Sequence, residues 1–283
     1  MPRLSVPGSE LHYERRGDGT PLLLIQGMGA NSRHWGEPFL CELERDFGLI
    51  LYDHRGVGRS GPLPADASTA DLAADALLLL DELEIARAHV FGISMGGMVA
   101  QELALSAPAR VATLTLGGTT AGGTQSRPTS QEVVSALTAA VLSGDRERIL
   151  RTGFEFVVSR AYAGSAVNYS AFAAAAAKYP ATVPVLMSQQ KAVLEHDTYG
   201  RLRGLSVPTL VIHGSRDQML AAAQRRPDRV ARPRRAVGAA GGRRPPVLLG
   251  ATRALSAAHP ASTPPHTNSH PAQTWAHPLG PIT

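Results

Sequence analysis

The 283-residue sequence has a single cysteine, Cys41, and aromatic residues make up only 5% of it. One cysteine excludes an intrachain disulfide and a thiolate metal cluster, so we expect Cys41 to be a buried or inert thiol. No segment has the roughly 18 uninterrupted apolar residues of a membrane span, and the N-terminal MPRLSVPGSE has no basic start followed by an apolar run. These absences favour a soluble, cytoplasmic protein with no membrane partner.

Charge is unevenly divided along the chain. Residues 221–283 hold nine Arg and one Asp but no Lys and no Glu, a net charge of +8, and residues 1–220 have a net charge of −3. The same segment holds ten of the 21 prolines and one aromatic residue, Trp275. Because no aromatic side chains are interleaved with the arginines, we expect weak, salt-sensitive attraction to nucleic acid at most, and no specific nucleic-acid partner.

Six short apolar segments predict the strands of a central, mostly parallel sheet of an α/β protein. They are LHYER (11–15), PLLLIQ (21–26), GLILYD (48–53), AHVFGI (88–93), VATLTL (111–116) and PTLVIH (208–213). Four of them are apolar almost throughout, which is typical of strands covered by helices on both faces. Between the third and the fourth, Ser68 and Asp71 have the spacing of a capping box at the start of an amphipathic helix.

The strand signal disappears between residues 122 and 201, where helix-like stretches such as SQEVVSALTAAVLSGDRERIL take over. We expect an all-helical insertion between two strands of the sheet. The predicted organisation is therefore a core formed by residues 1–121 and 202–220, a helical cap formed by residues 122–201, and an atypical Arg/Ala/Pro-rich tail, residues 221–283. The composition of that tail predicts disorder.

One short motif contains a candidate catalytic residue. The segment HVFGISMGGMVAQE (89–102) places Ser94 between Gly92 and Gly96, after a strand pattern and before a helix pattern. A G-x-S-x-G motif in this context is typical of a nucleophile elbow, a strained turn that projects the serine hydroxyl above the sheet. A purely structural turn is the alternative interpretation, and the flanking strand and helix disfavour it.

Four segments, in this order, resemble the α/β-hydrolase superfamily: LLLIQGMGA, LILYDHRGVGRSG, HVFGISMGGMVAQ and VPTLVIHGSRDQ. The resemblance extends over roughly residues 11–220. It implies an α/β-hydrolase fold with a helical cap, Ser94 as the nucleophile, and an oxyanion hole formed by the backbone N–H groups of Met28 and Met95. Gln26 stands where many relatives have His, which is compatible with a hole that uses backbone donors.

The resemblance also assigns the acid. Asp217 ends VPTLVIHGSRD, at the position where the superfamily carries its carboxylate, and the alternative position after VATLTL offers only residues 117–119, Gly-Gly-Thr. His213, at the end of the same strand, and His54, in the loop DHRG that braces the mouth of the site in relatives, are expected to be structural.

No cofactor and no metal are predicted. Gly27-Met28-Gly29 has two glycines of the dinucleotide fingerprint, but Ser32 occupies the place of the third. The expected partner is therefore a small, ester-like substrate alone, and the sequence predicts no particular oligomeric state.

The base of the triad is missing from its expected place. The chain order Ser, Asp, His requires a histidine after residue 217, which in relatives follows a further strand in a G-H context. The histidines available here are His259, His266, His270 and His277, and each has a proline beside or near it and no strand pattern before it. We therefore expect no working catalytic histidine and the loss of the last strand and helix.

A change of reading frame explains this tail. If the codons of RPPVLLGATRA (244–254) are read one base later, the first and third bases follow from the present residues and only the middle base is free. The new reading can be GHLFFWEQPER, with the histidine supplied by Pro245 when its codon is CCA. Our hypothesis is that a one-base change near residues 220–235 replaced the last strand, the histidine loop and the final helix.

These observations favour one function and leave others open. The first is hydrolysis of carboxylic esters or lactones through a Ser94 acyl-enzyme, impaired in this chain because the histidine is missing. The alternative is a catalytically dead α/β-hydrolase-like protein, either a frameshifted product or a binding protein. Carbon–carbon bond hydrolases and cofactor-free peroxidase-like members also use serine and remain open, whereas haloalkane and epoxide hydrolases attack with Asp.

Overall fold

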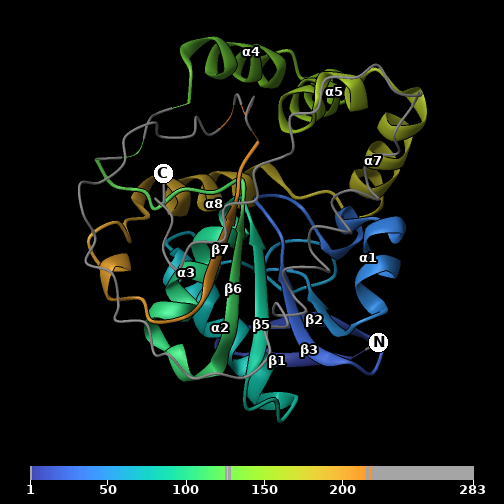
Figure 1. Ribbon diagram of the computed structural model, residues 1–283. Helices are drawn as coiled ribbons and strands as arrows, with labels where there is room; N and C mark the ends of the chain where they lie inside the picture. Colours follow the sequence, from blue (N-terminus) through green and yellow to red (C-terminus); the bar gives the residue numbers. More distant parts are fainter. Residues whose placement is uncertain (1, 125, 127–128, 215–216, 218, 220–283) are drawn as a thin grey trace, which may run out of the picture.

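The computed structural model describes residues 2–124, 126, 129–214, 217 and 219. A seven-stranded sheet with the order β1-β2-β4-β3-β5-β6-β7 runs through these residues (Figure 1). The strands are β1 Arg3–Val6, β2 Ser9–Arg16, β3 Thr20–Ile25, β4 Phe47–Tyr52, β5 Ala88–Ile93, β6 Val111–Gly117 and β7 Thr209–Ile212. The pairs from β4 to β7 are parallel, whereas β1 with β2 and β2 with β4 are antiparallel.

Helices lie on both faces of the sheet and at the carboxyl ends of its parallel strands (Figure 1). The α-helices are α1 Glu37–Glu44, α2 Thr69–Glu82, α3 Met95–Ser106, α4 Gln131–Leu142, α5 Arg146–Val157, α6 Arg160–Ala163, α7 Ala166–Lys178 and α8 Val183–Glu195. Short 3-10 turns cover Ser32–Trp35, Pro108–Arg110 and Leu202–Gly204. We refer to the segment from α4 to α8, which separates β6 from β7, as the helical insertion.

The predicted fold class is confirmed: the protein is α/β, with a mostly parallel sheet flanked by helices. All six predicted strands are present with small shifts of their ends, and β1 is an additional strand that forms a hairpin with β2. The predicted capping box is also present, because Ser68 N–H donates to Asp71 Oδ2 at 2.8 Å and Asp71 N–H donates to Ser68 Oγ at 3.2 Å. The single helical stretch predicted after residue 130 is two helices, which separate near Gly144.

The apolar run of β3 is explained by two hydrophobic layers. Leu23 and Ile25 belong to the cluster shared with α2 and α3, whereas Leu22 and Leu24 belong to the cluster on the other face, with α1. Because successive side chains of a strand point to opposite faces, a strand covered on both sides is apolar at every position.

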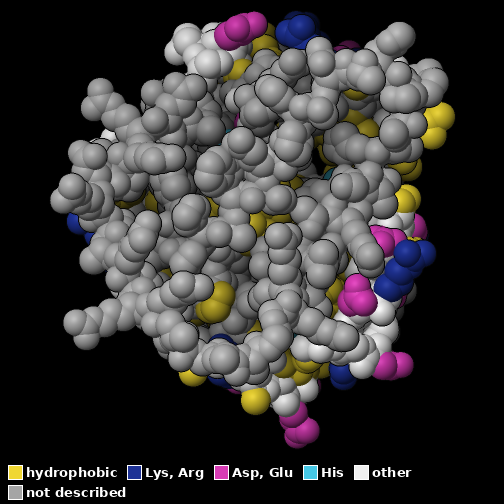
Figure 2. Space-filling view, viewed as in Figure 1, with side chains coloured by type: hydrophobic (Ala, Val, Ile, Leu, Met, Phe, Trp, Pro, Cys, Tyr) yellow, Lys and Arg dark blue, Asp and Glu magenta, His cyan; other side chains and the backbone are white. Residues whose placement is uncertain are grey.

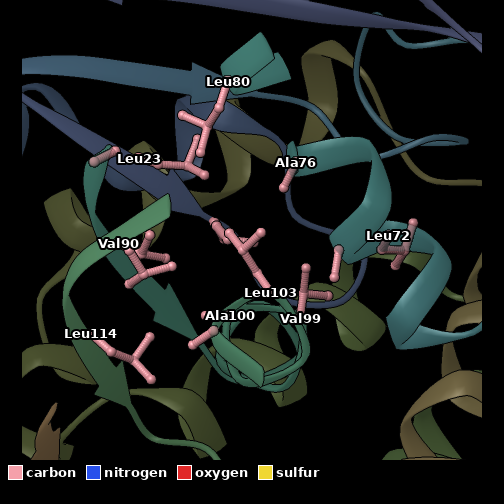
Figure 3. Close-up of a cluster of buried hydrophobic side chains, with 14 of the residues drawn as sticks. Leu23, Leu72, Ala76, Leu80, Val90, Val99, Ala100, Leu103 and Leu114 are labelled. Carbon is pink, nitrogen blue, oxygen red and sulfur yellow. The ribbon is translucent and has the colours of Figure 1, made fainter. Parts of the chain in front are cut away.

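The larger of the two layers fixes the position of α3. In Figure 3, Leu23, Val90 and Leu114 come from three strands and gather around Val99 and Leu103 of α3. All five side chains are almost completely buried. This packing holds the N-terminus of α3, which begins directly after Ser94, against the carboxyl edge of the sheet.

Charges on the surface near α1 are paired rather than gathered by sign. Arg16 forms ion pairs with Glu37 and Glu44, and Arg45 forms one with Glu42. Figure 2 shows acidic and basic side chains interspersed on this side of the molecule.

Two further expectations concern the membrane and the tail. Among the described residues, no helix is both long and apolar enough to span a membrane. The predictions for the tail, residues 221–283, lie outside the described residues, and so do the predicted loss of the last strand and helix and the frame change.

Candidate active site

Three loops begin at the same level of the sheet. In the register of the parallel strands, Ile93 pairs with Gly117, and Gly117 pairs with Ile212. Ser94 therefore follows β5 where Gly118 follows β6 and His213 follows β7. Since neighbouring strands lie about 4.8 Å apart, the backbones at Ser94 and at the end of β7 are about 10 Å from each other.

Ser94 occupies a strained turn. Its φ of 55° and ψ of −125° lie where a residue with a side chain is seldom found. The flanking glycines make this turn possible, because a Cβ on Gly92 would lie 2.2 Å from the carbonyl oxygen of Gly96. A Cβ on Gly96 would lie 2.2 Å from the carbonyl oxygen of Ile25. The chain therefore needs glycine at both positions for steric reasons, independently of the chemistry of Ser94.

The backbone of Ser94 is anchored to the next strand. Its N–H donates to the carbonyl of Gly117 at 2.9 Å, and its carbonyl accepts from Thr119 Oγ1 at 2.7 Å and from Gly97 N–H at 2.9 Å. The Oγ of Ser94 makes no hydrogen bond to any residue that the structure describes. The backbone of Ser94 is therefore held by hydrogen bonds, whereas no base among the described residues is hydrogen-bonded to its hydroxyl.

The segments expected to supply the oxyanion hole flank Ser94. A Cβ on Gly27 would lie 3.2 Å from the Cβ of Ser94, so the loop after β3 passes directly beside the serine. Met95 is the first residue of α3, where an N–H has no acceptor within the helix. Met95 thus directly follows Ser94, and Met28 directly follows the glycine that lies beside it, so the two residues come from different segments next to the serine.

Two glutamine side chains accept hydrogen bonds from the backbone N–H groups on either side of Met28. Gly27 N–H donates to Gln26 Oε1 at 2.9 Å, and Gly29 N–H donates to Gln189 Oε1 at 2.8 Å. The sequence offers no signal for Gln189, because it lies 160 residues from Gly29 in an ordinary amphipathic helix.

Asp217 lies over the end of β6, one strand away from Ser94. Its N–H donates to the carbonyl of Gly214 at 3.1 Å, and its Oδ1 accepts from Met219 N–H at 2.9 Å. A Cβ on Gly118 would lie 3.7 Å from Asp217 Oδ2. The same Oδ2 is 3.3 Å from Nε2 of His213. The predicted acid therefore stands at the carboxyl edge of the sheet with a histidine beside it.

His54 contacts the backbone of Gln26, the residue that directly follows β3. Its Nε2 is 3.0 Å from the carbonyl oxygen of Gln26, and its side chain is almost fully buried. Burial lowers the pKa of His54 to about 4. A neutral ring that donates to the carbonyl of Gln26 supports the end of β3, which fits the structural role expected for His54.

Asp53 connects the two loops on this side of the site. Its Oδ1 accepts Ser32 N–H at 2.7 Å, and its Oδ2 accepts Arg59 N–H at 3.0 Å. The side chain is 1% exposed. The sequence places Asp53 at the end of the predicted strand 48–53, and the structure places it directly after β4, but nothing in the sequence identifies its partners.

The histidines considered as bases after residue 217 lie outside the described residues. A separate finding concerns metal ions: the described residues contain no group of three or more His, Cys, Asp or Glu side chains that could hold one.

Comparison with known proteins agrees with this geometry. The family model described as alpha/beta hydrolase fold matches residues 20–236. The chain belongs to the alpha/beta hydrolase fold family. A solved hydrolase from Pseudomonas aeruginosa PA01 is similar in structure, with 30% identity and a TM-score of 0.66 over 78% of this chain and 82% of that one. The enol-lactonase of Burkholderia xenovorans LB400 is 26% identical, with a TM-score of 0.67 over 79% and 85% of the two chains.

Curated relatives match a shorter stretch. The proposed carbamate hydrolase RutD of Azorhizobium caulinodans is 41% identical over 116 residues, which are 41% of this chain and 43% of the relative. The rhodomycin D methylesterase DnrP of Streptomyces peucetius is 39% identical over 132 residues, 42% of this chain and 43% of the relative. The chain thus matches less than half the length of these relatives.

Proposed function

We propose that this protein is a hydrolase of carboxylic esters or lactones that uses Ser94 as its nucleophile and Asp217 as the acid. The observation that carries the proposal is the backbone of Ser94, which is strained and enclosed by glycines that leave no room for a Cβ. Strain of this kind is retained where a side chain must be presented for chemistry. The lactonase and the methylesterase among the similar proteins support acyl chemistry.

The proposed reaction has two steps. Ser94 Oγ attacks the acyl carbonyl carbon, and the carbonyl oxygen, now negative, accepts hydrogen bonds from the N–H groups of Met28 and Met95. The intermediate collapses with loss of the alcohol, which takes up the proton released from the Ser94 hydroxyl, and leaves an acyl-enzyme on Ser94. Water then attacks the acyl carbon, the bond from that carbon to Ser94 Oγ breaks, and one proton of the water returns to Oγ, which releases the carboxylic acid and regenerates the serine.

The helical insertion is proposed to cap this site. Leu186 of α8 would contact a Cβ on Gly29 at 2.7 Å, and Val185 would contact one on Gly56 at 2.8 Å. Asn31 Nδ2 also donates to the carbonyl of Tyr179, just before α8, at 3.5 Å. The insertion therefore rests on the loops that follow β3 and β4, where it would shape the binding pocket for the acyl or alcohol portion.

A second candidate function is binding without catalysis. It is favoured by one observation: within the described residues, no histidine is hydrogen-bonded to Ser94. Loss of one member of a catalytic triad costs about a million-fold in turnover, although about a thousand-fold over water can remain.

Labelling by a fluorophosphonate probe separates the two candidates. A triad-activated serine reacts within minutes, whereas a serine without its histidine reacts slowly, so we expect slow but measurable labelling of the native chain and none of Ser94→Ala. In protein with the reading frame restored, Asp217→Asn keeps the shape of the side chain and should slow the reaction by a factor of about 10⁴, because the carboxylate orients the histidine there. Native protein that labels no faster than Ser94→Ala would support the binding protein and contradict the hydrolase. Matched ethyl esters and lactones, assayed with the same three proteins, define the substrate class.

A further inference from the structure

The helical insertion reaches the loop after β3 through one buried side chain, Gln189 of α8. Gln189 is fully buried, and its Oε1 accepts the N–H of Gly29 at 2.8 Å. Leu186, almost one turn earlier on α8, packs on the same glycine. Gly29 has a φ of +69°, a conformation that glycine adopts readily and other residues do not. The helix therefore holds a turn of special backbone geometry.

The hydrogen bonds of this turn leave one amide uncommitted. Gly27 N–H is occupied by Gln26 Oε1 and Gly29 N–H by Gln189 Oε1. Between them, Met28 N–H donates to no acceptor in the part of the chain that the structure describes. Two glutamine side chains thus hold the neighbours of the amide that the proposed mechanism uses.

Packing alone does not explain a glutamine in this place. The Nε2 of Gln189 is buried and has no hydrogen-bond partner within the described residues. A buried amide donor without a partner costs free energy, and an apolar side chain of similar shape avoids that cost. What Gln189 adds over methionine is its acceptor oxygen on Gly29.

We propose that Gln189 is a positioning residue that holds the oxyanion loop and couples the helical insertion to the reactivity of Ser94. It acts through the backbone of Gly29 and does not touch the reacting atoms. While α8 is seated, the turn is fixed and Met28 N–H has one orientation. When α8 withdraws, Gly29 N–H loses its acceptor and the loop loses its preorganisation, which is what makes such donors effective. This inference rests on the proposed function.

Amide exchange of Gly29 tests the coupling without requiring catalysis. In protein labelled with ¹⁵N-glycine, we expect Gly29 N–H to exchange at least about ten-fold faster in Gln189→Met than in the native chain, because the acceptor is gone. Gln189→Glu keeps an acceptor oxygen and should keep the protection. Ser188→Ala is the matched control: Ser188 is the neighbouring buried residue of α8 and donates to the carbonyl of Pro64 at 2.9 Å, away from the oxyanion loop. It should leave Gly29 unchanged.

Labelling rates test the consequence for Ser94. Gln189→Met should react with a fluorophosphonate about ten-fold more slowly than native protein, with little change in melting temperature, because an unpaired buried donor is removed together with the bond. Gln189→Glu should also be slower, since its negative charge opposes the developing oxyanion, and Ser188→Ala should react at the native rate.

Equal Gly29 exchange in the native chain and in Gln189→Met overturns the proposal for Gln189. So does an equal loss of labelling in Ser188→Ala and Gln189→Met, which would indicate general loosening of α8. A native chain that does not label at all counts against the hydrolase function instead, and the exchange comparison still decides the role of Gln189.

Discussion

The turn at Ser94 shows how closely single residues determine the candidate site. Gly92 and Gly96 are enclosed by backbone atoms of α3 and β3, so each position has room for a hydrogen atom but not for a methyl group. Ser94 accepts a positive φ because its N–H and carbonyl are held by β6 and its loop. The energy stored in this turn is offset by hydrogen bonds on both sides of the residue.

We expect Gly92→Ala to lower the free energy of unfolding by about 3 kcal/mol or more, because the new Cβ meets a backbone atom that cannot rotate away. Urea denaturation measures the loss. Gly153→Ala is the control: nothing lies within 4 Å of its Cβ position in α5. That change should stabilise the protein by about 0.5–1 kcal/mol, as alanine does within helices. Equal midpoints for Gly92→Ala and the native protein would contradict the steric argument.

At the scale of elements, the end of the helical insertion is joined to the core by a buried histidine. His196, directly after α8, lies 3.0 Å from Thr69 Oγ1 at the start of α2 and 3.3 Å from Thr198 Oγ1. Glu102 of α3 is 3.9 Å away and forms an ion pair with Arg201. Three helices therefore meet at one titratable ring, where burial lowers the pKa of His196 to about 4.

This pKa predicts how stability depends on pH. Since the folded pKa lies below the ordinary value of 6.5, the unfolded chain takes up its proton first as the pH falls. The contribution of neutral His196 is complete above about pH 6.5 and is lost progressively toward pH 4, for a total of about 3 kcal/mol. His54 acts in the same direction, because burial also lowers its pKa to about 4.

Urea midpoints at pH 7, 5.5 and 4.5 measure this dependence. His196→Gln keeps a polar side chain that does not titrate, so the difference between its curve and the native curve isolates His196. We expect the stability of the variant to fall less steeply, by up to about 1.4 kcal/mol per pH unit in this window. Parallel curves would show that His196 is already able to take up a proton in the folded protein.

At the scale of the whole molecule, the order of strands decides which groups can meet. Ser94 and Asp217 follow β5 and β7, which lie on either side of β6, and the register brings their loops to one edge. His213 lies beside Asp217 but follows β7, two strands from Ser94, and no described histidine is hydrogen-bonded to Ser94. The proposed triad therefore requires a base from a further segment. The reading-frame hypothesis places that segment in residues 221–283, in a different frame.

The hypothesis makes a direct prediction. The coding DNA, read one base later after a point between codons 220 and 235, should contain a G-H motif followed by apolar residues and E-x-P. Protein expressed with the frame corrected should label with a fluorophosphonate up to about a million-fold faster than the native chain, because the histidine activates Ser94. A next frame without this motif, or equal labelling of the two proteins, would exclude the frame change.

Much of the fold was predictable because it depends on local pattern. Strand β3 is apolar at every position from Leu22 to Ile25, and the capping residues Ser68 and Asp71 stand in the order that a helix start requires. Strand β1 was missed because its four residues, RLSV, are too short to show a period. The break near Gly144 was missed because the residues on both sides favour helix equally.

The amino-acid sequence by itself determined the strands, the helices and the G-x-S-x-G turn, because hydrophobic period and glycine placement act over a few residues. Only the tertiary structure decided what lies beside that turn. Gly29 and Gln189 are far apart in the chain and carry no shared pattern, and their hydrogen bond exists because α8 packs across the loop after β3. The register of β5, β6 and β7 likewise brings Asp217 within one strand of Ser94, through pairings that no local stretch of sequence encodes.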